Sequence, residues 1–487
     1  MSVQIFLEGK LLGIDEFLLS PADASELAEA GECAEALLVG RSHWVSLLSE
    51  VLPRALLAEL GLARILLGSS GGGQFLVVLP EESRRAAEEF LEPAAADIDE
   101  LSGGHLRLVW AVTENLGDWS IVRRRLQEAM RPKREAPAAG AANGYFEPFS
   151  AAEQPPGEPY FSRQMGLRLK EAQRVGWSAE RPARILLEEG RHTWPVSNAP
   201  DAIPLARHAA PGEDHTSIAG AQQLAQRAEG RKAWAVLRGD VDNFGVRLRR
   251  LATIEEHVQT SVLYKNFFAG EIEVLCSMPE FWRRVSVIYT GGDDFAVYGA
   301  WDALIALAHE IQRLFHRFSE ENLKEFPGAE GKTISMAIVL APEEPVTLAE
   351  VFQEAGRKLE IAKSSDKDCL YLFGRTIEWR HLAQAVELKE NLSRLVRDYD
   401  CPPELLGEMA RLWRGAELAA PSRTPRFERP WRYHRRLTLM AGCARDRELE
   451  RLRSRLLADM IGKNAAQARL RPAGRVALEW AKLLNEA

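Results

Sequence analysis

Two short acidic clusters are the residues of this sequence best placed to perform chemistry. In GDVD, Asp240 and Asp242 follow an apolar run. In GGDD, Asp293 and Asp294 follow two glycines and separate two runs rich in β-branched and aromatic residues. Carboxylates that converge from strand ends bind hard divalent cations such as Mg²⁺, and two such cations stabilise the attacking and leaving oxygens of a nucleotidyl transfer. The clusters therefore predict attack of a ribose hydroxyl on the α-phosphate of a nucleoside triphosphate.

Each cluster also has a simpler explanation. Adjacent aspartates beside a glycine turn are often solvated turn residues that hold no ligand. Two clusters at the ends of neighbouring strands favour a shared site, because Asp240 could then face Asp293 or Asp294. Lys363 and Lys367 follow a predicted helix and could neutralise a triphosphate, but solvated lysines favoured by the helix dipole explain them equally well.

The segments around the clusters predict the elements that would position them. AWAVLRGD, VSVIYT and DFAVYG have the composition of strands, and the last two flank the Gly-Gly turn. Helical periodicity follows in residues 254–278 and again from Trp301. The strand TISMAIVLA, a helix that begins with a capping box of Thr347 and Glu350, and the strand CLYLFG complete the set. The order β-α-β-β-α-β-α-β contains a ferredoxin-like unit, so the predicted fold class is α/β (α+β).

An internal repeat places a second such unit near the N-terminus. SGGGQFLVVLP resembles TGGDDFAVYGA, so that Ser70, Gly71, Gly72 and Phe75 match Thr290, Gly291, Gly292 and Phe295. Upstream, FLEGKLLGIDEFL resembles VLRGDVDNFGVRL, which matches Gly9 with Gly239. The first copy has Gly73, Gln74 and Lys10 where the second has acids. Shared glycines indicate a shared backbone, and the unshared acids indicate that only the second copy performs the chemistry.

Composition divides the chain into four predicted parts. A segment rich in Pro, Gly and Ala at 131–160 and a second break at 419–431 read as linkers or long loops. The predicted parts are a first α/β unit at 1–135, a linker with a small intervening domain at 136–230, the acid-bearing unit at 231–375 and a bundle of amphipathic helices at 376–487.

Charge and composition exclude several classes of protein. The 487 residues carry a net charge of −8 and a pI near 5.8, which argues against a chain that coats nucleic acid through a global basic field. The five cysteines contain no CxxC pair, so neither a zinc ribbon nor a disulfide framework is expected. The N-terminus lacks the features of a signal peptide, and no apolar run approaches the roughly 18 residues of a membrane span. We expect a cytoplasmic protein that does not enter a membrane.

At these motifs the sequence resembles the large palm-domain subunit of type III CRISPR effector complexes, most of all the Csm (III-A) branch. The segments that carry the resemblance run in that family's order over nearly the whole chain: LVGRSHWVSLLSEVL, ILLGSSGGGQFLVVLP, MGLRLKEAQRV, VLRGDVDNFG, VIYTGGDDFAVYG, LEIAKSSDKDCLYLFG and RPWRYHRRLTLMA. GGDD with an upstream DVDN is a fairly specific pair. The resemblance implies two ferredoxin-like palm domains of the nucleotidyl cyclase type, a small intervening domain and a C-terminal helical bundle.

The same resemblance implies an activity and a set of site residues. Members of the family convert ATP to cyclic oligoadenylate when the complex binds target RNA, with two Mg²⁺ or Mn²⁺ ions. Asp240, Asp293 and Asp294 would be catalytic metal ligands, and Asp242 is a weaker candidate. The nucleotide-binding residues implied are Asn243, Phe244, Gly291, Gly292, Lys363 and Lys367 in the second palm, with Ser70, Gly71 and Gly72 of the degenerate first palm for the second nucleotide.

The resemblance also implies partners, and the sequence departs from the family in two respects. The partners would be guide RNA, target RNA, and Csm-type backbone, small and guide-5′-end-capping subunits. Many relatives begin with an HD nuclease domain, whereas no His-Asp dipeptide occurs here and the first palm strand starts near Met1, so we expect no intrinsic DNase activity of that kind. Relatives often carry a four-cysteine zinc site, but residues 136–200 contain no cysteine, so zinc is not expected.

Two other functions compete with this interpretation, and three further motifs carry basic or aromatic residues. A diguanylate cyclase would use GG(D/E)EF, whereas this motif is GGDDF and the palms are in tandem; an inactive structural subunit would not need its acids. Arg247, Arg249 and Arg250 are predicted as a solvated helix face rather than RNA or triphosphate ligands. Trp431 and Tyr433 are predicted as anchors of the bundle, and the basic face of ELERLRSRLLADM could meet RNA or the small subunit.

Overall fold

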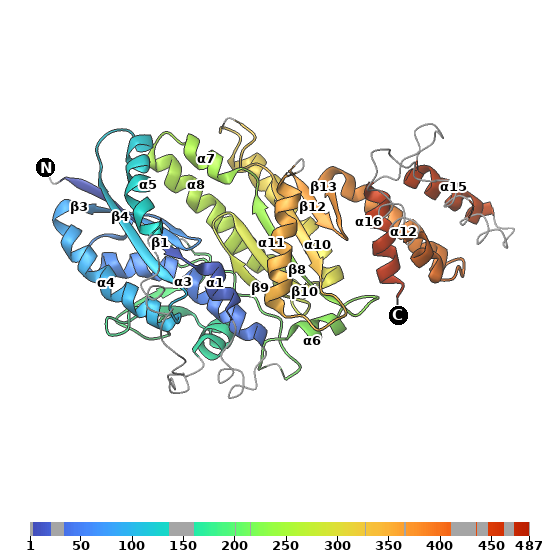
Figure 1. Cartoon of the computed structure of the whole chain (residues 1–487), viewed down its shortest axis with the longest axis horizontal. Coiled ribbons are helices and arrows are strands. Elements are labelled where there is room, and N and C mark those ends of the chain that lie inside the picture. The colour runs from blue at the N-terminus through green and yellow to red at the C-terminus, as the bar shows by residue number, and fades with distance from the viewer. Residues whose placement is uncertain are drawn as a thin grey trace, which may run out of the picture.

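The computed structural model describes residues 3–20, 34–135, 160–199, 201–214, 216–326, 328–364, 367–410, 435, 447–461 and 472–486. Two α/β halves lie next to each other along the long axis, and the C-terminal helices lie at one end (Figure 1). None of the helices in these ranges is long and apolar enough to cross a lipid bilayer.

The first palm is a four-stranded antiparallel sheet with helices around it. Its strands are β1 (Gln4–Leu12), β2 (Leu67–Gly71), β3 (Gln74–Pro80) and β4 (Arg107–Glu114), in the order β2-β3-β1-β4. Its helices are α1 (Ile14–Leu19), α3 (Ala34–Glu59), α4 (Arg84–Leu101) and α5 (Trp119–Glu135). Residues 131–135, which the sequence assigned to a linker, therefore extend α5 with Pro132 inside the helix.

The second palm repeats this sheet and adds two strands. Its strands are β8 (Trp234–Val241), β9 (Val285–Thr290), β10 (Asp294–Ala300), β11 (Ile334–Leu340), β12 (Cys369–Leu372) and β13 (Arg375–Glu378), in the order β13-β12-β11-β8-β10-β9. Its helices are α7 (Phe244–Arg250), α8 (Ile254–Asn266), α9 (Ile272–Cys276), α10 (Trp301–Asn322) and α11 (Leu348–Ser364). The segment β9-β10-β8-β11 has the connectivity of β2-β3-β1-β4, so the fold class and the tandem palms predicted from the sequence are confirmed.

A glycine under an aromatic ring occupies the same place in both sheets. Gly9 of β1 is paired with Phe75 of β3, and Gly239 of β8 is paired with Phe295 of β10. A Cβ atom on Gly9 would lie 2.1 Å from the Phe75 ring, and one on Gly239 would lie 2.3 Å from the Phe295 ring. Each ring therefore lies over the backbone of the neighbouring strand, which only glycine allows at this distance.

The remaining described segments are an intervening region and the C-terminal helices. The intervening region contains a turn of π-helix (Tyr160–Leu167), the strands β5 (Arg174–Trp177), β6 (Leu186–Leu187) and β7 (His192–Pro195), and α6 (Ala221–Gln226). The C-terminal helices include α12 (Trp379–Arg397), α15 (Arg447–Ile461) and α16 (Pro472–Leu484). Trp431 and Tyr433 lie outside the described residues.

The two palms share one hydrophobic core. Val77 of the first palm, Ile185 of the intervening region, and Val236, Tyr298 and Phe352 of the second palm are buried members of one cluster. α3 of the first palm lies against β9 of the second, and α8 of the second lies against β2 of the first. Because both faces of the second sheet are covered, β8 is apolar along most of its length instead of alternating.

Candidate active site

Three of the four predicted acids meet at one edge of the second palm. Asp240 of β8 and Asp294 of β10 are directly opposite each other in the antiparallel register. The amide of Val241 donates a hydrogen bond to the carbonyl of Asp293 at 2.9 Å, which holds the turn against the end of β8. The sheet therefore brings Asp240, Asp293 and Asp294 together, as the two motifs and their strand placement predict.

Burial and mutual repulsion make these carboxyl groups weak acids. Burial raises the pKa of Asp240 to about 6, against the opposing effect of the Lys363 ammonium. The pKa of Asp293 is raised by burial and then by the charges of Asp294 and Asp240. Burial also raises the pKa of Asp294. Each of these carboxyl groups therefore binds a proton more readily than an exposed aspartate does, and a bound cation would compensate the charge of the ionised form.

The two predicted lysines reach the site, which argues against their being only solvated helix-end residues. The Lys363 ammonium lies 2.7 Å from Asp240 Oδ1, and its side chain is 23% exposed. The Lys367 ammonium donates to the side-chain oxygen of Asn243. Lys367 and Asp368 have φ values of 57° and 49°. Consecutive non-glycine residues in the left-handed region are strained, which is common in functional loops.

Asp294 has a neighbour that the sequence reasoning missed. The Tyr289 hydroxyl donates to Asp294 Oδ2 at 2.8 Å, and it accepts a hydrogen bond from Arg238 Nη2 at 3.2 Å. The Arg238 guanidinium in turn lies 4.3 Å from the centroid of the Phe352 ring. Tyr289 stands inside the VIYTGGDD motif, but a tyrosine in a strand is so common that its type gave no signal.

Asp242 is buried, and its carboxylate is fully engaged by hydrogen-bond donors of the second palm. Asp242 is 1% exposed. Its carboxylate accepts hydrogen bonds at 2.8 Å from the hydroxyls of Thr333 and Ser335 and at 3.0 Å from the amide of Asp368. These contacts join the end of β8 to the start of β11 and to the loop before β12. The geometry supports a structural role, in which Asp242 holds the strand ends that carry the site.

Replacement of Asp242 by alanine is expected to destabilise the chain by about 2–4 kcal/mol, because two hydroxyls and one amide lose a charged acceptor in a buried place. Urea denaturation of the full chain in the presence of EDTA measures this loss. Asp242→Asn retains one acceptor oxygen and is expected to lose less. Unchanged stability of Asp242→Ala together with weaker metal binding would instead support a ligand role.

The chemistry of the three acids suits a divalent cation, although two of their carboxylates already have protein partners. Within the described part of the chain, no three His, Cys, Asp or Glu side chains are arranged to hold a metal ion. Asp240 is bound to Lys363, and Asp294 is bound to Tyr289. All the candidate ligands are carboxylate oxygens in surplus negative charge, which is the donor set that Mg²⁺ and Mn²⁺ prefer. Asp240, Asp293 and Asp294 are therefore the residues that would hold such ions.

Metal-free chains are expected to show the raised pKa of these acids as a dependence of stability on pH. A carboxyl whose pKa is higher in the folded than in the unfolded state stabilises the fold at low pH, and this contribution is lost as the pH rises through the folded pKa. Asp293→Asn is therefore expected to be more stable than the wild type by about 1–2 kcal/mol at pH 8 in EDTA, with little difference at pH 4. Thermal unfolding of both chains from pH 4 to 8 measures this; a difference independent of pH would contradict it.

The Gly-Gly turn of the first palm faces that of the second. A Cβ atom on Gly72 would lie 3.4 Å from the amide nitrogen of Gly292. Gly72 and Gly73 have φ values of 58° and 74°, a conformation that disfavours any side chain. Gly292 and Asp293 do not have positive φ, so the second turn can carry a carboxylate where the first has glycine. The different turn conformations give a physical reason why only one palm carries the acids.

A cavity of about 390 Å³ lies between the palms at this contact. Its lining includes Gly72 and Gly73 of the first palm and Arg238, Tyr289 and Asp294 of the second. A carboxylate oxygen, a hydroxyl and a guanidinium thus border one space between the two turns. The cavity places a ligand where residues of both palms could contact it.

The other predicted nucleotide-binding residues have mixed surroundings. A Cβ atom on Gly291 would lie 2.1 Å from Asp294 Oδ1, so a side chain there would displace the Asp294 carboxylate. Asn243 has a φ of 59° and precedes α7. The Phe244 ring packs 4.7 Å from Tyr264, against the core rather than in the space between the turns. Ser70 and Gly71 are the last two residues of β2, directly before the first-palm turn.

The arginines after the DVDN motif differ from the solvated helix face predicted for them. Arg247 is 4% exposed, and its Nε lies 3.4 Å from the Tyr264 hydroxyl, so the prediction is wrong for this residue. Its long side chain packs inward because α7 covers the aromatic cluster around Tyr264. Arg249 is exposed, and Arg250 pairs with Glu330 at 2.7 Å on the surface.

Comparisons with known proteins place part of the sequence in a family and the chain in a fold. Residues 233–371 match the family described as Cas10/Cmr2, second palm domain. The chain is 30% identical over 218 residues to the CRISPR system single-strand-specific deoxyribonuclease Cas10/Csm1 (subtype III-A) of Mycobacterium tuberculosis. The aligned region covers 40% of this chain and 25% of that protein. The protein of the same name from Enterococcus italicus is 28% identical over 184 residues, 36% of this chain and 22% of that protein. The matches span about a quarter of the length of these relatives.

Solved structures share the fold over nearly the whole chain. The apo Csm1–Csm4 cassette has a TM-score of 0.73 at 18% identity, and the match covers 99% of this chain and 70% of that one. The cassettes in complex with AMPPNP and with cA4 have TM-scores of 0.71 and 0.72 at 16% and 17% identity, with the same coverage. At this level of identity the likeness concerns the fold.

Residues 233–371 thus match the second palm domain of Cas10/Cmr2, and nearly the whole chain shares the fold of the solved Csm1–Csm4 cassettes. The relatives and structures named above are all of the Csm type, which agrees with the resemblance seen in the sequence.

Proposed function

We propose that this chain converts ATP to cyclic oligoadenylate by nucleotidyl transfer. The observation that carries the proposal is the cross-strand pair Asp240 and Asp294, with Asp293 beside it, opposite the Gly-Gly turn of the other palm. Related cassettes of the same fold have been solved with AMPPNP and with cA4. A triphosphate analogue and a cyclic adenylate in proteins of this fold support the same substrate and product here.

In the proposed reaction, a ribose hydroxyl of one ATP attacks the α-phosphate of another, and pyrophosphate leaves. Asp240, Asp293 and Asp294 would hold two Mg²⁺ or Mn²⁺ ions, which neutralise charge on the phosphates and lower the pKa of the attacking hydroxyl. Tyr289 orients the Asp294 carboxylate through its hydrogen bond. Lys363 supplies a positive charge at Asp240, close to where phosphate oxygens would gather.

The partners belong to the same proposal. We propose that the chain works in a complex with guide RNA, target RNA and Csm-type subunits, since similar folds have been solved as Csm1–Csm4 assemblies. The deoxyribonuclease activity in the names of the relatives is a property of those proteins. The expectation that this chain lacks it stays a prediction, and incubation with labelled single-stranded DNA tests it.

Product analysis tests the proposed function. The complex with guide RNA and matching target RNA is incubated with ATP, with GTP or with both, in Mg²⁺ or Mn²⁺, and the products are identified by mass spectrometry. Cyclic oligoadenylate from ATP alone is expected. Cyclic di-GMP from GTP would identify a diguanylate cyclase. No product from either nucleotide, with binding of target RNA intact, would leave a structural subunit.

A further inference from the structure

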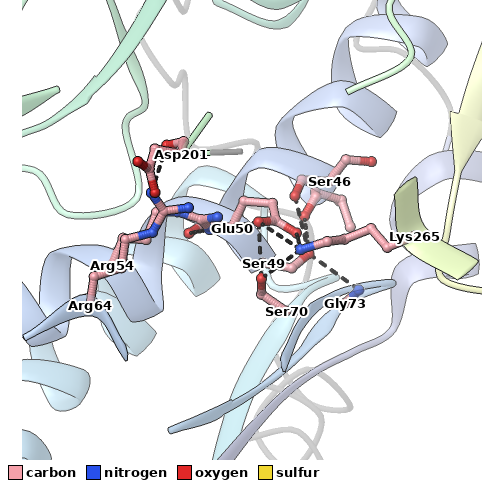
Figure 2. A network of polar contacts seen from close by, with 10 residues as sticks. Ser46, Ser49, Glu50, Arg54, Arg64, Ser70, Gly73, Asp201 and Lys265 are labelled. Atoms are coloured by element: carbon pink, nitrogen blue, oxygen red, sulfur yellow. Dashed lines mark hydrogen bonds and ion pairs between the residues drawn. The ribbon is translucent and has the colours of Figure 1, made fainter. Parts of the chain in front are cut away.

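A network of buried polar side chains joins the two palms beside the Gly-Gly turn of the first palm (Figure 2). It consists of Glu50 and Arg54 on α3, Ser70 on β2 and Lys265 on α8, and it is called the inter-palm network below. Lys265 Nζ lies 3.1 Å from Glu50 Oε1 and 3.1 Å from Ser70 Oγ. Ser70 donates to Glu50 Oε2 at 3.0 Å. One side chain of the second palm thus contacts both a helix and the turn of the first.

The network is buried and depends on the charge of Glu50. The side chains of Glu50 and Arg54 are 4% and 3% exposed, and that of Lys265 is 14% exposed. Burial alone would raise the pKa of Glu50, but the charges of Lys265 and Arg54 lower it to about 2, so the group stays ionised. Two cations share one carboxylate. Loss of Lys265 leaves a Glu50–Arg54 pair, whereas loss of the Glu50 charge leaves two cations facing each other without an acid.

The same side chains determine where the first-palm turn lies. A Cβ atom on Gly71 would lie 3.3 Å from Lys265 Cδ and 3.4 Å from Glu50 Oε1, so the turn packs directly on this pair. The amide of Gly73 donates to Ser49 Oγ at 3.2 Å, which holds the other end of the turn to α3. Gly72 lies between these two attachments and faces the second palm.

We propose that Lys265 is a positioning residue for the reaction, and that the inter-palm network holds the first-palm turn at the separation from the second-palm acids that nucleotidyl transfer needs. The inference rests on the proposed function. Lys265 acts through Glu50 and Ser70 and does not touch the reacting phosphates. Because small misplacements of one reactant against the other reduce rates by large factors, the network affects the rate of transfer more than metal binding.

Substitutions in the full chain, within its RNA-bound complex, test the proposal. Lys265→Met is expected to lower the rate of product formation at saturating ATP at least tenfold, with unchanged Mn²⁺ affinity, and Lys265→Arg is expected to retain most of the rate. Glu50→Gln is expected to lower the unfolding midpoint more than Lys265→Met. The double variant Glu50→Gln/Lys265→Met is expected to be more stable than Glu50→Gln alone, because one unpaired cation is gone, yet to remain as slow as Lys265→Met.

The control is Glu89→Gln, which breaks the exposed pair of Arg85 and Glu89 at 2.8 Å in the same palm. It is expected to change neither the rate of product formation nor the unfolding midpoint. A Lys265→Met chain that forms product at the wild-type rate would overturn the proposal. So would a double variant whose drop in unfolding midpoint equals the sum of the drops of the two single variants. A wild-type complex that makes no product would refute the proposed function instead. The order of the unfolding midpoints then still decides whether the network joins the palms.

Discussion

A chain with both Asp293→Ala and Asp294→Ala is expected to make no detectable cyclic oligoadenylate, a loss of at least about a thousandfold in rate. Two of the three converging carboxylates are removed, and Asp240 alone, bound to Lys363, cannot replace them. Mass spectrometry of the products of ATP, with the RNA-bound complex of each chain, measures the effect. Titration with Mn²⁺ is expected to show a parallel loss of metal binding.

Loss of the fold cannot explain such a result if stability is measured beside it. Both acids have a raised pKa in the folded chain, so their removal is expected to leave the unfolding midpoint at pH 8 in EDTA unchanged or higher. Glu81→Ala/Glu82→Ala is a matched control, because it removes an adjacent acidic pair of the first palm away from the site. Product formation by the double aspartate variant at a rate near that of the control would refute the assignment of the site.

Gly239→Val is expected to destabilise the chain by about 2–4 kcal/mol and to abolish activity. A Cβ atom at this position would lie 2.3 Å and 2.6 Å from two atoms of the Phe295 ring and 3.2 Å from Met336 Cγ. The strands must separate or the ring must move, and the next residue along β8 is Asp240. Urea denaturation and product analysis measure the two effects.

The first palm supplies the control for this substitution. Gly9→Val meets the Phe75 ring at 2.1 Å, in the same position of the sheet, but Lys10 follows it where Asp240 follows Gly239. It is expected to reduce stability to a similar extent while retaining more activity. Phe295→Leu is expected to restore part of the stability of Gly239→Val, since the smaller side chain frees the space. A stable and active Gly239→Val chain would contradict the structural explanation for these glycines.

The repeat and the hairpin allowed the central part of the site to be predicted from the sequence. Matching Gly9 with Gly239 and aligning the two Gly-Gly turns already implied that the end of β8 faces GGDD, and the register of the strands agrees. Strand order and turn position follow from local patterns of apolar residues and glycines. Local patterns were therefore sufficient for Asp240 and Asp294.

Contacts between distant segments could not be predicted in the same way. Glu50 and Lys265 are 215 positions apart, and no local pattern around either residue marks it as the partner of the other. The burial of Arg247 and the hydroxyl partners of Asp242 likewise depend on which helix covers which strand. The packing of a particular helix on a particular strand leaves no periodic pattern in a single sequence.

The hydrophobic cluster shared by the two palms affects how the chain unfolds. Val236, Tyr298 and Phe352 of the second palm belong to a buried cluster that also contains residues of the first palm and the intervening region. A fragment reduced to the second palm would expose this face to water, so the two palms are expected to unfold as one cooperative unit. The palm without the acids therefore contributes part of the buried surface on which the acid-bearing palm packs. Its removal is expected to cost the acid-bearing palm stability even though it supplies no carboxylate to the site.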